Sequence, residues 1–295
     1  MVLVTGAAGF VGSALLAAAP AGVEVVGTWR STPPAVPVDA RRVELSDAAA
    51  TAALVAEVAP EVVVHTAYGR GGDLRRDVVD ATAAVVDAVA ATGAALVHLS
   101  SDVVFDGESA PYDEASPPRP VSAYGRAKAA AEAEVDAVLD DAAVVRFSLV
   151  LAADGTDRSS TWVADTLRDG RPVDAHVDEV RMPVLREDLV RGLWRLLALP
   201  RADRAGTWHL PGPTALSRYD LALQVCHAVA GDPGLVRPVP TPRDVDDPRP
   251  RDLRLGDARA RSVLGWNPGD VGGRMPADAT VVPSAEQPHD RLDRP

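Results

Sequence analysis

In the first half of this 295-residue chain, short β-branched runs alternate with alanine-rich stretches of helical periodicity. Such alternation predicts βαβ units and a parallel sheet. The strand segments are almost continuously apolar, as expected for strands that crossover helices bury on both faces. We therefore predict an α/β fold with a doubly wound parallel sheet. Strands are expected at residues 2–5, 24–28, 42–45, 61–66, 95–100 and 143–147, and helices near 10–19, 47–59, 74–92 and 122–140.

The second half is less regular and is interrupted by proline and glycine. We predict one domain over residues 1–150, with parts of 181–215 packing back on it, and a smaller lobe over 151–271. Residues 272–295 have little apolar periodicity and are predicted to be a disordered tail. Within the lobe, 238–250 are expected to form a loop. Further helices are expected at 158–169, 186–199, 217–230 and 257–264, with a short strand at 207–210.

Charge and composition exclude several classes of function. The net charge of −12 gives no basic footprint for nucleic acid. No apolar run approaches the ~20 residues of a transmembrane helix, so we expect no membrane insertion and a cytoplasmic protein. The single cysteine, Cys226, excludes an intrachain disulfide and is expected to be a buried, inert thiol. The six histidines show no metal-binding spacing, and His98 is expected to be a satisfied core or interface residue.

A glycine-rich turn follows the first predicted strand and opens the first predicted helix. It reads Thr5-Gly6-Ala7-Ala8-Gly9-Phe10-Val11-Gly12. Glycines in this context let the backbone approach a pyrophosphate, whose charge then meets the free amides at the helix start. We predict a Rossmann-type NAD(P)-binding domain. The expected cofactor contacts in this turn are Gly6, Ala8, Gly9, Phe10, Val11 and Gly12.

The end of the second strand bears on which nicotinamide cofactor is bound. NAD-preferring proteins place an acidic residue there for the ribose 2′-hydroxyl, whereas this chain has Arg30 and Ser31. A guanidinium can pair with a 2′-phosphate. We therefore expect NADP(H) to be favoured, with NAD(H) possible, and an ordinary surface role for Arg30 is the alternative. Asp47 either approaches the adenine or serves as an acid at a helix N-terminus.

Three residues suited to carbonyl reduction occur in the middle of the chain. Ser101 ends the fifth predicted strand, at the carboxyl edge where open α/β sheets bind ligands. Tyr124 and Lys128 are four residues apart on a predicted helix and so share a face. A neighbouring ammonium lowers the tyrosine pKa from about 10, which allows proton exchange nearer neutral pH. We assign Tyr124 as the acid, Ser101 as hydrogen-bond donor to the carbonyl, and Lys128 as tuner of Tyr124 and ribose contact.

At these motifs the chain resembles the extended short-chain dehydrogenase/reductase superfamily, and within it the dTDP-4-dehydrorhamnose reductase-like group. Leu99 to Gly107 is similar to that group's S-T-D-Y-V-F-D-G, and Tyr124 to Lys128 to its Y-G-x-x-K. Similarity continues to about residue 268. The resemblance implies NADPH-dependent reduction of a 4-keto-6-deoxy sugar nucleotide, with a C-terminal lobe that binds the sugar. It further implies cofactor contacts at Ala67 and Tyr68, and substrate contacts at Ser101, Asp102, Arg181 and Arg249, the two arginines on the diphosphate.

Other segments depart from the pattern of that group. Residues 65–70, 78–82 and 149–160 differ from the loops and the asparagine-rich helix usual there. Asp102 is followed by Val103 instead of a second acid, which disfavours dehydratase chemistry. Two alternatives to a reductase stay open: a non-catalytic NADP-binding subunit resembling methionine adenosyltransferase regulatory subunits, and an NAD-dependent sugar-nucleotide epimerase. A homodimer is possible.

Overall fold

The structure is a computed structural model that describes residues 1–69, 72–243 and 245–272. It divides into two compact units, one built from residues 1–104, 123–146 and 190–208, and the other from 105–122, 147–189 and the chain from 209 onward. All but the first residue of the predicted tail lie outside the described residues. No helix in the described ranges is both long and apolar enough to cross a membrane.

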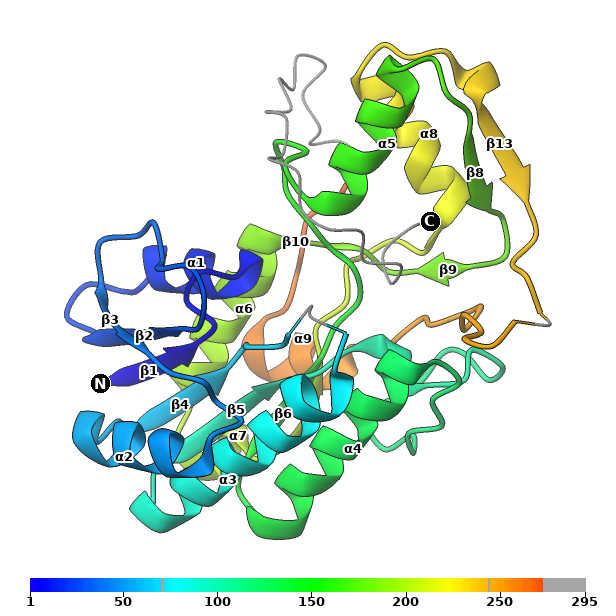
Figure 1. Cartoon of the computed structure of the whole chain (residues 1–295). Coiled ribbons are helices and arrows are strands. Elements are labelled where there is room, and N and C mark those ends of the chain that lie inside the picture. The colour runs from blue at the N-terminus through cyan, green and yellow to red at the C-terminus, as the bar shows by residue number, and fades with distance from the viewer. Residues whose placement is uncertain (70–71, 244, 273–295) are drawn as a thin grey trace. The chain divides into compact units, whose positions relative to one another are not determined.

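A seven-stranded sheet with the order β11-β6-β5-β4-β1-β2-β3 forms the centre of the first unit (Figure 1). Its strands are β1 Val2–Thr5, β2 Val25–Trp29, β3 Asp39–Arg42, β4 Val62–His65, β5 Ala95–Leu99, β6 Ala143–Arg146 and β11 Gly206–His209. The five pairings among the six strands numbered β1 through β6 are all parallel. The carboxyl ends of these strands therefore meet at one edge of the sheet, and the predicted doubly wound parallel sheet is confirmed.

Helices cover both faces of this sheet. Figure 1 shows α2, α3 and α4 along one face and α1 with α6 on the other. The helical segments are α1 Phe10–Ala17, α2 Ala48–Val58, a π-helix at Arg75–Asp80, α3 Ala81–Thr92, a 3₁₀ turn at Asp102–Val104, α4 Ala123–Val138, α6 Arg186–Leu197 and α7 Arg201–Arg204. Aliphatic side chains such as Leu3, Val63, Val85 and Leu96 form the core between sheet and helices.

Two sequence predictions needed correction in this unit. The third strand was expected at 42–45 but runs over Asp39–Arg42, where it pairs with β2 from Val26 to Trp29. It is an edge strand with exposed or half-buried residues, so it lacks the apolar run that marks the other strands. The single helix expected at 74–92 begins as a π-helix and becomes regular at Ala81.

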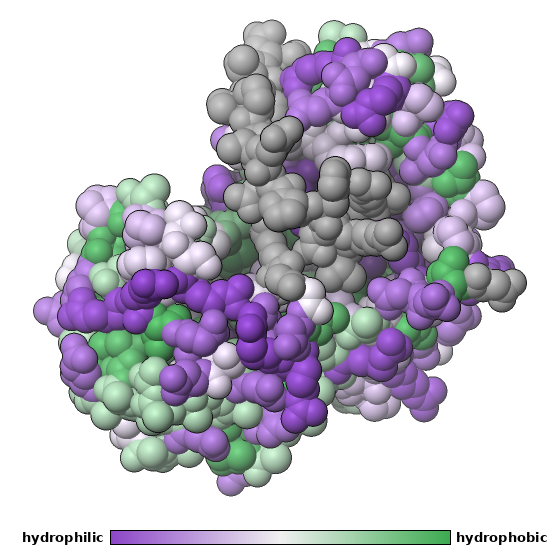
Figure 2. Space-filling view, viewed as in Figure 1, coloured by the Kyte–Doolittle hydropathy of each residue, from purple (hydrophilic) through white to green (hydrophobic). Residues whose placement is uncertain are grey.

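The described part of the second unit holds three small sheets and three α-helices. Its strands are β7 Val150–Leu151, β8 Val173–His176, β9 Val180–Arg181, β10 Val184–Leu185, β12 Leu216–Ser217 and β13 Val236–Val239, and its helical segments are α5 Arg158–Arg168, α8 Arg218–Ala228, a 3₁₀ turn at Pro233–Leu235 and α9 Ala258–Leu264. One core, which includes Val163, Val173, Val225 and Cys226, joins α5 and α8 to β8 and β13. On the face shown in Figure 2, hydrophobic residues of the described chain are interspersed with hydrophilic ones.

A buried ion pair fastens α4, which carries Tyr124 and Lys128, to the sheet. Glu132 of α4 lies 2.7 Å from Arg146 at the end of β6, and both side chains are about one-twentieth exposed or less. Two guanidinium nitrogens, Nε and Nη2, donate to the carboxylate. Bidentate geometry of this kind fixes orientation as well as distance, so the pair sets how α4 lies against β6.

We expect Glu132→Ala to lower the free energy of unfolding by about 3–5 kcal/mol, because it leaves the buried Arg146 without its carboxylate. Urea denaturation measures the loss. Asp174→Ala is the matched control, since it removes the carboxylate from an ion pair with Arg237 in which both side chains are half exposed, and such pairs contribute at most about 1 kcal/mol. Equal losses in the two variants would contradict the fastening role of Glu132.

Candidate active site

The glycine turn between β1 and α1 leaves no room for side chains. Gly6 has φ +71°, and a Cβ there would lie 2.9 Å from the Ala67 Cα, while a Cβ on Gly12 would lie 2.3 Å from the Gly6 carbonyl oxygen. Gly9 is the N-cap of α1 and supplies no side-chain acceptor to its first amides. Ala8 and Gly9 are exposed, and Phe10 and Val11 are half-buried. A helix start of this kind is suited to bind an anionic phosphate.

A buried histidine fixes the segment that faces this turn. His65 ends β4; its Nδ1 lies 2.8 Å from Thr5 Oγ1, and its Nε2 lies 3.2 Å from Thr82 Oγ1. Because the Thr82 hydroxyl donates to the Val78 carbonyl, Nε2 must be the donor and Nδ1 must accept from Thr5. Burial, and then the charge of Lys128, lowers the His65 pKa to about 3, so the ring is neutral.

Thr5 also forms hydrogen bonds with the segment that follows β4. Its Oγ1 accepts from the amides of Thr66 and Ala67, at 3.2 Å each, and the Thr66 hydroxyl donates to the Thr5 carbonyl at 2.6 Å. Ala67 is thereby held against Gly6. The sequence analysis assigned Ala67 to the cofactor site but gave no role to His65 or Thr5, because this network joins residues about 60 positions apart.

Lys128 is the most unusual side chain at the carboxyl edge of the sheet. It is the only lysine among the 30 lysines and arginines of the chain, and it is 4% exposed. Its Nζ donates to the Leu99 carbonyl at the end of β5, at 2.7 Å. Burial lowers its pKa to about 8, and Glu132 partly opposes this change. The side chain is therefore largely charged at neutral pH, one helical turn after Tyr124.

Ser101 and Tyr124 belong to the same unit as Lys128. The Ser101 hydroxyl donates to Asp102 Oδ1 at 3.2 Å and accepts weakly from the Val103 amide at 3.4 Å. Asp102 is buried, whereas Ser101 and Tyr124 are half-buried. The Tyr124 ring lies 6.1 Å from that of Tyr68, which is 44% exposed. Tyr68 thus stands beside the assigned acid, on the segment that Thr5 anchors.

Arg30, the residue predicted to select the cofactor, is paired with carboxylates. Its Nη1 lies 2.8 Å from Asp77 Oδ1 and 3.8 Å from Glu44 Oε2. Arg76 shares Asp77 at 2.8 Å. Burial raises the Asp77 pKa, but the hydrogen bonds from Arg76 and Arg30 outweigh it and leave the pKa below its ordinary value. Gly69 is required here, because a Cβ would lie 1.9 Å from Asp77 Oδ2.

The two remaining cofactor candidates in this region differ in their bonding. Ser31 is exposed. Asp47 is the N-cap of α2, and its carboxylate accepts from the Ala50 amide at 3.0 Å. The structure shows the helix N-terminal role of Asp47, and its approach to the adenine stays a prediction.

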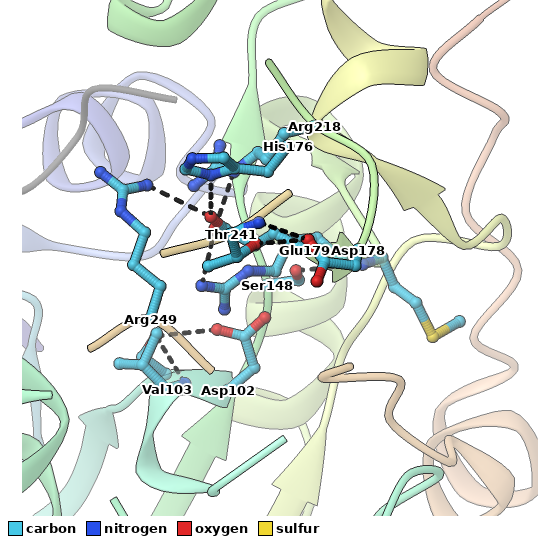
Figure 3. Close-up of polar contacts among 12 residues, drawn as sticks. Asp102, Val103, Ser148, His176, Asp178, Glu179, Arg218, Thr241 and Arg249 are labelled. Carbon is cyan, nitrogen blue, oxygen red and sulfur yellow. Dashed lines mark hydrogen bonds and ion pairs between the residues drawn. The ribbon is translucent and has the colours of Figure 1, made fainter. Parts of the chain in front are cut away.

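In the second unit, Arg181 and Arg249 meet on one buried carboxylate, that of Glu179. Figure 3 shows Arg249, Arg218 and His176 around Glu179. Arg218 donates to the same carboxylate at 2.9 Å, and His176 lies 3.2 Å from it. Three guanidinium groups thus share a single acid that is fully buried. The sequence analysis predicted two of the arginines but missed Glu179, Arg218 and His176, whose positions in sequence carry no common motif.

The three arginines and His176 determine the ionisation of Glu179. Burial alone raises the Glu179 pKa, but Arg218, the His176 hydrogen bond, Arg181 and Arg249 outweigh it and hold the pKa well below its ordinary value. Arg249 is the most exposed of the three arginines, at 24% against 6% for the others. Within the described residues, no group of three or more His, Cys, Asp or Glu is placed to hold a metal ion.

Glu179 gives a pH dependence of stability. Because its pKa is lower in the folded than in the unfolded state, its contribution is present above the unfolded pKa and is lost as pH falls through the folded one. We expect the free energy of unfolding of the wild type to fall more steeply between about pH 5 and pH 3 than that of Glu179→Gln. Parallel pH profiles in urea denaturation would contradict this assignment.

Comparisons with known proteins identify relatives over most of the chain. A dTDP-4-keto-6-deoxy-D-glucose reductase of Streptomyces niveus is 32% identical over 269 residues, which cover 86% of this chain and 88% of the relative. Methionine adenosyltransferase 2 subunit beta of Bos taurus is 28% identical, covering 75% of this chain and 70% of the relative. A hypothetical dTDP-4-dehydrorhamnose reductase from Sulfolobus tokodaii has a similar structure, with a TM-score of 0.80, 27% identity, and coverage of 92% of this chain and 98% of that chain.

Other solved structures of the same fold contain NADP or NAD. The family model described as the RmlD substrate binding domain matches residues 1–269. The match spans both units and every candidate residue described above. The chain therefore belongs to the RmlD substrate-binding domain family, the dTDP-4-dehydrorhamnose reductase-like group of extended short-chain dehydrogenases/reductases.

Proposed function

We propose that this protein reduces a nucleotide-linked 4-keto-6-deoxy sugar with NADPH, and that Tyr124 donates the proton. The observation that carries this proposal is the buried Lys128 ammonium, held on the Leu99 carbonyl one helical turn from Tyr124. A cation at that position stabilises the phenolate that remains after Tyr124 gives up its proton. The similarity to a dTDP-4-keto-6-deoxy-D-glucose reductase supports the class of substrate.

In the proposed reaction the nicotinamide supplies a hydride to the carbonyl carbon. The Ser101 hydroxyl donates a hydrogen bond to the carbonyl oxygen, and the Tyr124 proton moves to that oxygen as it becomes a hydroxyl. Lys128 stays charged and also contacts the cofactor ribose. The buried position of Lys128 supports this role, because the electrostatic stabilisation that a charge gives to a nearby anion is larger in a region of low dielectric than in water.

We expect Tyr124→Phe to abolish turnover, with a loss of at least about a hundredfold, because it removes the proton donor. Cofactor affinity should stay close to that of the wild type. NADPH oxidation is followed by absorbance with a panel of nucleotide 4-keto-6-deoxy sugars, and binding by fluorescence titration. Tyr219→Phe, which likewise removes a tyrosine hydroxyl but lies on α8, is the matched control and should stay active. Undiminished turnover by Tyr124→Phe would contradict the assignment.

We propose NADPH as the favoured cofactor because Arg30 directly follows β2, and a guanidinium there could pair with a 2′-phosphate. Asp77 and Glu44 compete for Arg30, so a 2′-phosphate must draw Arg30 from these carboxylates. Arg76, which shares Asp77, can keep that acid paired when Arg30 turns away. This competition moderates the preference for NADPH and keeps NADH as a second cofactor.

We expect Arg30→Ala to weaken NADPH binding about tenfold or more and to leave NADH binding nearly unchanged, since NADH lacks the phosphate that Arg30 would pair with. Isothermal titration with each cofactor measures both affinities. Arg41→Ala is the matched control: Arg41 lies on neighbouring β3 and pairs with Asp39 and Glu57. Equal losses for the two cofactors would remove Arg30 from the proposed role.

The arginines around Glu179 support a diphosphate-containing substrate. Three guanidinium groups meet at one carboxylate, and planar guanidinium groups bind phosphate oxygens in pairs. Arg249, the most exposed of the three, is proposed to make the first contact, with Arg181 behind it. The identity of the sugar rests on the substrate panel.

A non-catalytic regulatory subunit is the second candidate function. It is favoured by the similarity to methionine adenosyltransferase 2 subunit beta over three-quarters of the chain. The two functions are distinguished by the substrate panel, because a regulatory subunit binds NADPH but oxidises none of it. Inactivity across the whole panel, with intact cofactor binding, would therefore favour the regulatory function.

A further inference from the structure

His98 is buried near the carboxyl end of an interior strand and lacks the hydrogen bonds that an imidazole normally makes. It lies on β5, is 1% exposed, and neither ring nitrogen has a partner among the described residues. The sequence analysis predicted a buried histidine with its hydrogen bonds satisfied. The structure confirms the burial, but it shows no hydrogen-bond partner for either ring nitrogen within the described residues. Burial, Lys128 and His65 together hold its pKa well below the ordinary value, so the ring is neutral and offers one donor and one acceptor.

The side chain of His98 faces the helices that carry the site. His98 is the direct partner of His65 in the β4–β5 ladder, and the two rings are 5.4 Å apart. His65 reaches Thr82 on α3 from the same face of the sheet. Both nitrogens of His65 are already engaged, by Thr5 and Thr82. His65 therefore does not supply the hydrogen bonds that His98 needs.

Lys128 has N–H donors beyond the one that binds the Leu99 carbonyl. An ammonium carries three N–H donors, and within the described residues Lys128 uses one of them, on the carbonyl of Leu99, the residue after His98. This contact places the ammonium at the strand position next to His98, and its charge lowers the pKa of both His65 and His98. Ser100, two residues after His98 and 3% exposed, likewise has a hydroxyl oxygen without a partner.

Unsatisfied polar groups that are buried together are normally joined by an ordered water with two to four polar partners. We propose that an internal water bound by His98 and the Lys128 ammonium, with Ser100 beside it, links the two side chains and makes His98 a positioning residue for Lys128. The water accepts from a Lys128 N–H and donates to the unprotonated nitrogen of His98. No proton is transferred; the link holds the ammonium in place and favours its charged form.

The groups that face Lys128 define what else affects its ionisation. They are His65 on β4, His98 and Ser100 on or next to β5, and Tyr124 and Glu132 on α4, the last of these paired with Arg146 of β6. Both histidines are neutral, and Glu132 is the nearest acid that opposes the effect of burial. Loss of the His98 acceptor therefore destabilises the ammonium without changing any formal charge, and the Lys128 pKa must fall.

The single lysine makes the link directly measurable. Protein labelled with ¹³C-lysine gives one side-chain NMR signal, whose pH titration reports Lys128 alone. We expect His98→Phe to lower the Lys128 midpoint by about one pH unit, and His98→Gln, which keeps an acceptor, to restore most of it. His227→Phe, an exposed histidine of the second unit, is the control and should leave the midpoint unchanged. Identical midpoints in His98→Phe and wild type would overturn the proposal.

A second measurement does not require His98 to be replaced. In ¹⁵N-histidine spectra, Lys128→Met should shift the His98 ring nitrogens and leave those of His227 in place, and unmoved His98 signals would also overturn the proposal. Neither measurement uses substrate, so an inactive protein can still show the link. The consequence for turnover rests on the proposed function: the alkaline limb of the pH–rate profile should move to lower pH in His98→Phe.

Discussion

The ammonium of Lys128 at the end of β5 is the constraint on which the candidate site depends. A buried charge is costly unless polar groups surround it, and here a strand carbonyl, a paired glutamate and two neutral histidines do so. An arginine at this position would be charged at any pH, and five N–H donors would need hydrogen-bond acceptors. A lysine has three N–H donors, and its pKa responds to its surroundings. A lysine therefore suits this position better than an arginine would.

Several elements hold that group in place. The Glu132–Arg146 pair fastens α4 to β6, and the Leu99 carbonyl binds Lys128 from β5. On the next strand, His65 and Thr5 order the segment that packs against the glycine turn. The glycine turn after β1 and the Lys128 contact at the end of β5 thus lie at the carboxyl ends of strands in one parallel sheet. That sheet positions both the proposed cofactor site and the groups of the proposed chemistry.

Arginines in both units are held by shared buried carboxylates. Asp77 binds Arg30 and Arg76 in the first unit, and Glu179 binds three arginines in the second. A shared acid keeps each guanidinium oriented. We propose that an anionic phosphate competes with these carboxylates for the guanidinium groups. The same arrangement is therefore proposed to serve both the cofactor and the substrate.

The sequence by itself determined the parallel sheet, the glycine turn and the Tyr124–Lys128 pair, because each depends on residues close together in the chain. It placed β3 three residues too late, since an edge strand lacks the apolar run of a buried one, and it did not predict the π-helix before α3. Tertiary structure alone decided the partners: Asp77 for Arg30, Glu179 for Arg181 and Arg249, and the unsatisfied His98 beside Lys128. These contacts join positions that are distant in sequence, and their burial sets the charge state of each group, which no local pattern records.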